Sequence, residues 1–177
     1  LVGLPGRDYK LAPATLDEAL ALAGRGSQHR VQPFALNLTQ PTDFGTLYAL
    51  DELAALGAVA RRHGLRVHMD GARFANAVAA LDCSPADLTW RCGVDVLSLG
   101  ATKNGAINAE AVVVFDADTV EPMALQTLDD IPGGGTRMTK AARGIPWVLV
   151  NGEVIFDGKA MTAARPGRIL KGPSAEW

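Results

Sequence analysis

The stretch that decides the fold runs from Leu65 to Asn104 and reads LRVHMDGARFANAVAALDCSPADLTWRCGVDVLSLGATKN. It contains two short segments, Arg66–Asp70 and Asp95–Leu99, whose length and apolar content are typical of β-strands. Between them lies a longer segment with apolar residues at helical spacing. Strand, helix and strand in this order predict parallel strands joined by a crossover helix.

A chemically useful side chain follows each of these predicted strands. Asp70 ends the first, and Lys103 follows the second, 33 positions later in the chain. Open α/β sheets bind ligands outside the carboxyl ends of their strands. A desolvated lysine amine attacks carbonyl groups and a carboxylate can hold a pyridinium nitrogen, so the pair fits pyridoxal 5′-phosphate (PLP). Two ordinary solvated residues are the alternative interpretation of the same spacing.

The rest of the chain up to Phe115 repeats the alternation of strands and helices. We expect a helix from Pro13, with Thr15 as N-cap and Glu18 completing a capping box, and a second helix over Leu50–His63, with His63 as a surface cap. Two further helices are expected over Ala72–Leu81 and from Ser84. We expect strands over Pro33–Thr39 and Ala111–Phe115. The predicted fold class is α/β, with a largely parallel sheet covered by helices.

Length, charge and cysteine content exclude several classes of function. A chain of 177 residues can bury roughly 70% of its unfolded surface, which is enough for a real core. Its 17 basic and 19 acidic residues give a net charge of −2, so no basic field attracts nucleic acid or an anionic membrane. No apolar run is long enough to span a membrane and no signal peptide opens the chain, so we expect a cytoplasmic protein in which Cys83 and Cys92 are reduced thiols.

Two motifs resemble a known enzyme family. HMDGARFANA and CSPADLTW-x-x-GVDVLSLGATKNGA are similar to segments of low-specificity L-threonine aldolases, PLP enzymes of the aspartate-aminotransferase fold type. The resemblance covers about Leu1–Phe115 and implies a partial PLP-transferase-like fold. By this resemblance Lys103 carries the cofactor, Asp70 partners its pyridine nitrogen, and Arg73 lies beside cofactor and substrate. Thr102 is a candidate for hydrogen bonding to the cofactor phosphate.

The same resemblance implies an activity and a gap in the site. The family cleaves β-hydroxy-α-amino acids to glycine and an aldehyde, in homo-oligomers whose sites are shared between subunits. The phosphate cradle of these enzymes, and the ring that stacks on the cofactor, lie upstream of the position that matches Leu1. We therefore expect PLP binding by this chain to be impaired.

A second resemblance begins where the first one ends. AVVVFDADTV, DIPGGGTRMT, GIPWVLVNGEVIFDGK and TAARPGRIL resemble the C-terminal segment of D-aminoacylases and related N-acyl-D-amino-acid deacylases of the amidohydrolase superfamily. The two resemblances overlap at Ala109–Phe115, so we expect a chimera of a threonine-aldolase-like segment, 1–115, and a β segment, 116–177. Asn151-Gly152 between apolar runs predicts a C-terminal β-hairpin.

Three functions stay open on these grounds: a PLP-dependent carbon–carbon lyase acting on a small amino acid, a non-catalytic α/β scaffold, and a fragment of a metal-dependent hydrolase. A metal could bind the His68-x-Asp70 pair, but no third ligand is evident, and we expect a packed, hydrogen-bonded histidine and no metal site. Turn formation is the favoured role of Thr42 and Asp43. Gly133–Thr136 lacks the spacing of a phosphate-binding loop and predicts a flexible loop.

Overall fold

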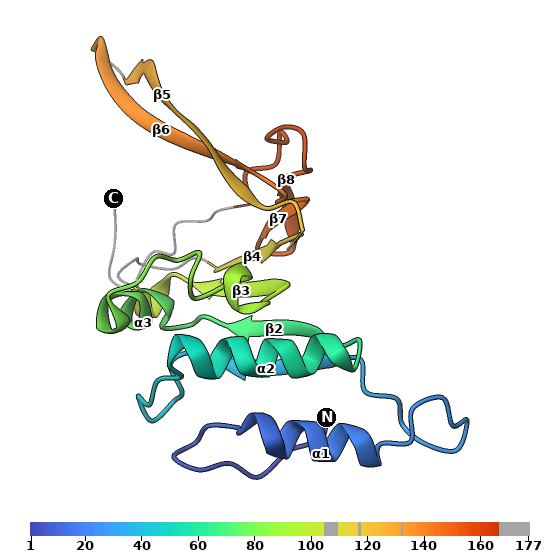
Figure 1. The fold of residues 1–177 in the computed structure, drawn as a ribbon. Coiled ribbons are helices and arrows are strands. Elements are labelled where there is room, and N and C mark those ends of the chain that lie inside the picture. The colour runs from blue at the N-terminus through green and yellow to red at the C-terminus, as the bar shows by residue number, and fades with distance from the viewer. Residues whose placement is uncertain (105–109, 117, 132, 167–177) are drawn as a thin grey trace, which may run out of the picture.

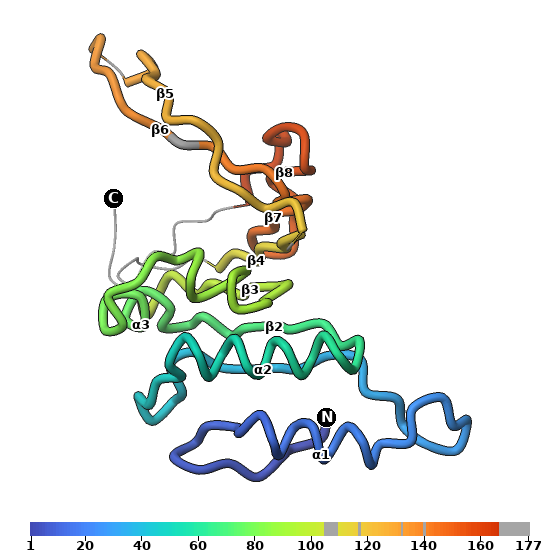
Figure 2. Tube along the Cα trace, in the orientation of Figure 1, coloured from blue at the N-terminus to red at the C-terminus, as the bar shows by residue number. Residues whose placement is uncertain are grey.

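Figure 1 shows the computed structural model of the chain, which describes residues 1–104, 110–116, 118–131 and 133–166. The helices and strands are, in chain order, α1 (Pro13–Leu22), β1 (Ala35–Thr39), α2 (Leu50–Arg62), β2 (Arg66–Asp70), α3 (Phe74–Leu81), the 3₁₀ turn η1 (Trp90–Cys92), β3 (Val96–Gly100), the 3₁₀ turn η2 (Thr102–Asn104), β4 (Glu110–Val114), β5 (Glu121–Ile131), β6 (Gly135–Arg143), β7 (Trp147–Val150) and β8 (Glu153–Phe156). Figure 2 traces the same path and shows α1 and the β5–β6 pair at opposite ends of the molecule.

The main sheet has six strands in the order β1-β2-β3-β4-β7-β8. The first three strands are parallel, whereas β4, β7 and β8 each run antiparallel to the neighbour before them. The expected largely parallel sheet is therefore wrong for the second half of the fold. A parallel pair needs a crossover of a dozen or more residues, and the connection between Gly100 and Glu110 is too short for one.

The crossover helix α2 lies between β1 and β2 in sequence, as expected. Side chains at its two termini determine where it begins and ends. The Glu52 carboxylate accepts a hydrogen bond from the N–H of Ala49 at 2.8 Å, and acidic residues occupy the first turn. Basic residues occupy the last turn, where they complement the helix dipole. His63 is the C-cap, as predicted, and its Nε2 also lies 2.7 Å from Oδ1 of Asp17 on α1.

One predicted N-cap and two predicted helix starts differ from the structure. α1 begins at Pro13 with Ala12 as N-cap, so the predicted Thr15 cap is wrong: proline is favoured at a first helical position and moves the start upstream. α3 begins at Phe74, because residues 71–73 form a turn after β2. The segment from Ser84 forms turns and no helix, although the Asp87 N–H does donate to Oγ of Ser84 at 3.2 Å.

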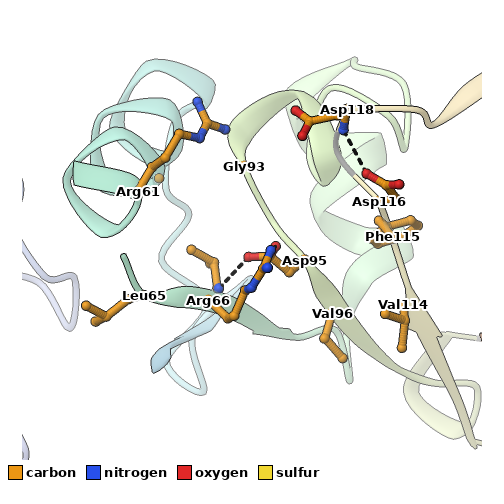
Figure 3. Close-up of a pocket in the computed structure, with 12 residues that line it drawn as sticks. Arg61, Leu65, Arg66, Gly93, Asp95, Val96, Val114, Phe115, Asp116 and Asp118 are labelled. Atoms are coloured by element: carbon orange, nitrogen blue, oxygen red, sulfur yellow. Dashed lines mark hydrogen bonds and ion pairs between the residues drawn. The ribbon is translucent and has the colours of Figure 1, made fainter. Parts of the chain in front are cut away.

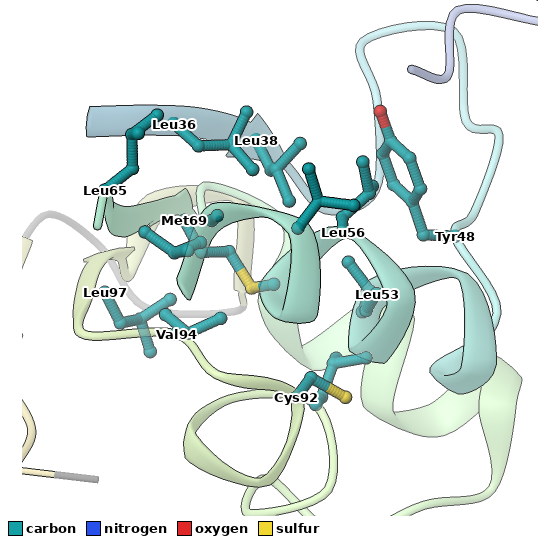
Figure 4. Packing of buried hydrophobic residues seen from close by; sticks show 14 of the residues in the cluster. Leu36, Leu38, Tyr48, Leu53, Leu56, Leu65, Met69, Cys92, Val94 and Leu97 are labelled. Carbon is teal, nitrogen blue, oxygen red and sulfur yellow. The ribbon is translucent and has the colours of Figure 1, made fainter. Parts of the chain in front are cut away.

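The hydrophobic core lies between one face of the sheet and the helices. Alternate residues of the parallel strands point to this face, and Met69 of β2 is fully buried there. Leu53 and Leu56 of α2 pack onto it (Figure 4). The other face of β1 and β2 carries polar residues, among them Asn37, His68 and Asp70.

The C-terminal hairpin is confirmed, and a second hairpin was not expected. Asn151 and Gly152 both have positive φ, 48° and 79°, as a type I′ turn requires, and they join β7 to β8. β5 and β6 form a separate two-stranded ribbon that projects from the main sheet (Figure 1). Gly133 and Gly134 lie in the turn of this ribbon, while Gly135 and Thr136 belong to β6, so the predicted flexible loop is shorter than expected.

Candidate active site

Three loops meet at the carboxyl edge of the parallel strands. They follow β1 (residues 40–46), β2 (residues 71–73) and β3 (residues 101–104). Backbone hydrogen bonds join the strand ends: the Gln40 N–H donates to the Asp70 carbonyl at 3.0 Å, and the Gly71 N–H donates to the Ser98 carbonyl at 2.8 Å. The predicted site residues therefore lie at one edge of one sheet.

Asp70 is the last residue of β2 and lies beside Thr39 of β1 and Ser98 of β3 in the sheet register. Its Oδ1 accepts a hydrogen bond from the Ala72 N–H at 2.9 Å, which fixes the carboxylate above its own turn. Among the described residues, the other carboxylate oxygen has no hydrogen-bond partner, and the side chain is only half-buried. One acceptor oxygen is thus free for a ligand at the carboxyl edge.

Arg73 is the N-cap residue of α3, and its side chain reaches toward the loop after β1. Its Nη1 lies 2.8 Å from Oδ1 of Asp43, and the side chains are 27% and 77% exposed, respectively. Thr42 has the predicted turn role, because its N–H and hydroxyl both bond Thr46 within the loop. Asp43 also lies in this turn, as predicted, but its side chain does not bond its own backbone. Asp43 instead links two of the three loops.

Lys103 and Thr102 lie in η2, immediately after β3, and both are exposed. Within the described parts of the chain, the Lys103 ammonium group makes no ion pair and no hydrogen bond. The structure therefore places Lys103 on the loop that follows the strand next to β2, at the same edge as Asp70. The amine is accessible to a carbonyl ligand from solvent.

Asn104 was not anticipated as a site residue, yet its carboxamide connects two of the loops. Oδ1 accepts a hydrogen bond from the Ala75 N–H at 2.8 Å. Nδ2 lies 3.2 Å from the carbonyl oxygens of Gly71 and Ala72, and it also contacts the Gly100 carbonyl. The sequence signal was available, because asparagine after a strand end often bonds backbone groups, but its partners are far away in sequence.

His68 is a hydrogen-bonded histidine, as predicted. Its Nδ1 lies 2.5 Å from Oδ1 of Asn37 and its Nε2 lies 2.7 Å from Oγ of Ser98, so the ring bridges β1 and β3. In the described ranges, no three His, Cys, Asp or Glu side chains are placed to hold a metal ion. His68 supports the polar face of the sheet that leads up to Asp70.

A cavity of about 680 Å³ lies at the opposite, amino-terminal edge of the parallel strands (Figure 3). Two of the charged groups at its wall bond within the fold: Asp95 accepts from Nη1 of Arg66 at 2.8 Å and from the Val67 N–H at 2.7 Å. The hydrogen bond that Arg66 donates to Asp95 raises the pKa of Arg66. None of the four predicted site residues lines this cavity, so the candidate site is the open carboxyl edge.

The model of the β-eliminating lyase family matches residues 2–150. The chain belongs to the β-eliminating lyase family. Its match extends past residue 115, and the comparisons give no support to the predicted D-aminoacylase-like segment.

Threonine aldolases are among the relatives of this chain. The chain is 49% identical over 112 residues to a low-specificity L-threonine aldolase of Pseudomonas aeruginosa and 46% identical over 112 residues to another from Pseudomonas sp. strain NCIMB 10558. In both cases the match covers 63% of this chain and 32% of the relative. The chain thus matches about a third of the length of these curated relatives.

A solved structure shares the fold. The threonine aldolase of Leishmania major superposes with a TM-score of 0.55 at 34% sequence identity, over 64% of this chain and 32% of that one. The described part of the chain contains no helix with the length and apolar character needed to cross a membrane.

Proposed function

We propose that this chain carries part of the active site of a PLP-dependent lyase that cleaves a β-hydroxy-α-amino acid between Cα and Cβ, giving glycine and an aldehyde. One observation carries the proposal: Asp70 ends β2, Lys103 follows the adjacent parallel strand β3, and both lie at the same edge of the sheet. The sequence identity to threonine aldolases supports the choice of substrate class.

The residues at this edge fit the ring end of PLP. The exposed amine of Lys103 suits the aldehyde group, and the Asp70 oxygen that has no hydrogen-bond partner among the described residues suits a protonated pyridine nitrogen. Gly71 allows the loop to pack tightly here, since a Cβ on it would lie 2.8 Å from Cδ1 of Leu97. Thr102 is assigned to the cofactor phosphate. The described residues offer no further phosphate ligand that we can assign, so weak binding stays part of the proposal.

When bound, PLP supplies an electron sink for the pair of electrons released from the broken Cα–Cβ bond. Asp70 holds the proton on the pyridine nitrogen and so keeps that sink strong. Arg73 binds the substrate carboxylate with the guanidinium donors that Asp43 leaves unused. Lys103 would hold the cofactor, and its protonated amine would donate a proton to Cα after the Cα–Cβ bond breaks, while the proton of the substrate β-hydroxyl would pass to solvent as the aldehyde forms.

The proposal includes an assembly. Since the chain matches about a third of its curated relatives, the remaining cofactor contacts come from residues outside the matched region or from a second subunit of a homo-oligomer. A small amino acid is the only substrate required, and we place the protein in the cytoplasm. The predicted division at residues 115 and 116, with a deacylase-like tail, is kept as a prediction. No observation favours the hydrolase or scaffold alternatives.

The experiment is PLP uptake at Lys103. The wild-type protein, mixed with PLP, should develop a visible absorption band that borohydride abolishes, and mass spectrometry should find the reduced cofactor on Lys103. Lys103→Ala should show neither signal, while Lys159→Ala, which removes another exposed lysine, should behave as wild type. Cofactor on other lysines but not on Lys103 would refute the proposal. Glycine released from L-threonine would then identify the reaction.

A further inference from the structure

We propose that Asn104 is a positioning residue: its carboxamide fastens the turn that carries Lys103 to the loop that follows Asp70, and so sets the separation of the two groups. The inference rests on the proposed function for its chemical meaning. Its structural basis is a set of hydrogen bonds between one side chain and two loops.

The first half of the carboxamide completes the N-terminus of α3. The first N–H groups of a helix have no partner within the helix and need an acceptor from elsewhere. Arg73 occupies the N-cap position and provides no side-chain acceptor. Oδ1 of Asn104 accepts from the N–H of Ala75, the second residue of α3, at 2.8 Å. A residue 29 positions away thus supplies the missing cap.

In this arrangement one residue caps the helix and another reaches toward a ligand, two roles that a single N-cap residue usually cannot combine. Serine, threonine, asparagine and aspartate are preferred at N-caps because their short side chains fold back onto the helix. Arginine has no acceptor atom and instead extends away, which leaves it free to reach Asp43 and a ligand. Because Asn104 caps α3, an arginine can stand at the helix start beside the site.

The second half of the carboxamide holds the loop after β2. Nδ2 lies 3.2 Å from the carbonyl oxygens of Gly71 and Ala72, and it contacts the carbonyl of Gly100 at the end of β3. The two chain segments are close enough here for so short a side chain, since a Cβ on Gly100 would lie 3.2 Å from Cα of Ala72. Only an amide offers both an acceptor and two donors at this length.

The consequence concerns Lys103 and Asp70. Lys103 precedes Asn104 in η2 and its ammonium group makes no ion pair or hydrogen bond among the described residues, so the position of η2 sets where its amine lies. Asp70 is fixed to the loop after β2 through the Ala72 N–H. Asn104 provides a side-chain link between these two segments. Reactive groups need placement within about 0.5 Å, so loosening this link should weaken cofactor capture.

The test compares Asn104→Ala and Asn104→Asp with Asn76→Ala, which removes an exposed asparagine from α3. Asn104→Asp keeps an acceptor for Ala75 but turns a carboxylate toward three carbonyl oxygens. Two readouts are used well below the unfolding temperature of each variant: the fraction of Lys103 that borohydride links to PLP across a PLP titration, and amide hydrogen exchange of the 70–75 segment.

Both Asn104 variants should need about 10-fold or more PLP for half-maximal labelling of Lys103, whereas Asn76→Ala should match wild type. Exchange in the 70–75 segment should speed up in Asn104→Ala and stay unchanged in Asn76→Ala. Equal labelling of folded Asn104 variants and wild type would overturn the positioning role. If wild-type Lys103 takes up no PLP, the proposed function fails. Unchanged exchange in Asn104→Ala would separately overturn the bridge.

Discussion

The Asp43 carboxylate lies 2.8 Å from Nη1 of Arg73, and this ion pair joins the loop after β1 to the start of α3. Asp43 engages a single nitrogen of a group that has five N–H donors. The remaining donors can bind a carboxylate in the paired geometry that arginine favours. Asp43 therefore orients Arg73 and, at the same time, places a negative charge beside the position that a substrate carboxylate would occupy.

Removing that charge should strengthen ligand binding. Asp43→Asn keeps an oxygen that accepts from Nη1 but removes the competing charge, so we expect the KM for a β-hydroxy-α-amino acid, or the Kd for glycine, to fall about 2- to 5-fold. The exposed ion pair is worth about 1 kcal/mol or less, so the free energy of unfolding should change little. Asp8→Asn, which removes an exposed acid that does not contact Arg73, is the control. A raised KM would show that the charge on Asp43 is needed for orientation.

Gly57 should not tolerate alanine even though it lies inside helix α2. Alanine normally stabilises a helix interior by about 1 kcal/mol over glycine. A Cβ on Gly57 would lie 2.1 Å from the carbonyl oxygen of Cys92, so the helix would have to move away from η1. We expect Gly57→Ala to lower the free energy of unfolding by about 1–3 kcal/mol in urea titrations.

The neighbouring exposed position provides the reference for this substitution. Ala58→Gly should cost about 1 kcal/mol, the ordinary propensity difference. A Gly57→Ala protein more stable than wild type would mean that α2 and η1 are not packed as closely as the structure shows.

Asp87 should contribute to stability in acid. Hydrogen bonds from Ser84 and then from Arg91 lower the pKa of Asp87 from 3.8 to about 2 in the folded chain. Because the fold favours the ionised form, this stabilisation is complete above about pH 4 and is lost as the pH falls from about 4 to 2. The unfolding free energy of Asp87→Asn should consequently fall less steeply than that of wild type across this interval.

Urea titrations at several pH values measure that slope. Asp129→Asn serves as the control, since Asp129 is exposed on β5 and makes no side-chain interaction among the described residues. Parallel acid limbs for wild type and Asp87→Asn would contradict the assignment.

The two thiols should differ in reactivity. Burial raises the pKa of Cys92 to about 11, and its Sγ donates to the Asp87 carbonyl at 2.7 Å. The pKa of Cys83 is also raised, chiefly by burial, but this residue is only half-buried. With an aromatic disulfide reagent at pH 8, Cys83 should react at least about 10-fold faster than Cys92 in the folded protein.

Cysteine variants identify the phases. Cys83→Ser should abolish the fast phase, Cys92→Ser the slow one, and denaturant should make both thiols react alike. A fast phase that survives in Cys83→Ser would show that Cys92 is accessible.

Local signals predicted the parallel half of the fold well. The strand Arg66–Asp70 lies where its length and apolar content placed it, and Asn151-Gly152 forms the expected turn, because both depend on residues close in sequence. The predicted direction of the strands after β3 was wrong, because that direction depends on which strand β4 pairs with in the assembled sheet. The β5–β6 ribbon was missed because its strands carry no regular apolar alternation and remain exposed on both faces.

The candidate site, like the fold, was predicted only in part from the sequence. Spacing and resemblance predicted Asp70, Arg73 and Lys103 at one sheet edge from the sequence alone. Asp43 and Asn104 were not assigned to it, because their partners lie about 30 positions away in the chain. Which backbone N–H an asparagine will cap, or which loop an aspartate will join, is settled only when the strands are assembled.

We expect the β5–β6 ribbon to tolerate insertion or replacement of sequence. The strands on either side of the ribbon, β4 and β7, are neighbours in the main sheet. The two ends of the ribbon therefore lie close together, where Glu121 pairs with Arg143 and the Asp116 N–H donates to the Gly144 carbonyl at 2.8 Å. A short turn in place of residues 123–141 should therefore leave the unfolding midpoint of the main sheet unchanged. The β5–β6 ribbon is therefore a site at which a reporter or an affinity tag can be inserted, at the end of the molecule opposite α1.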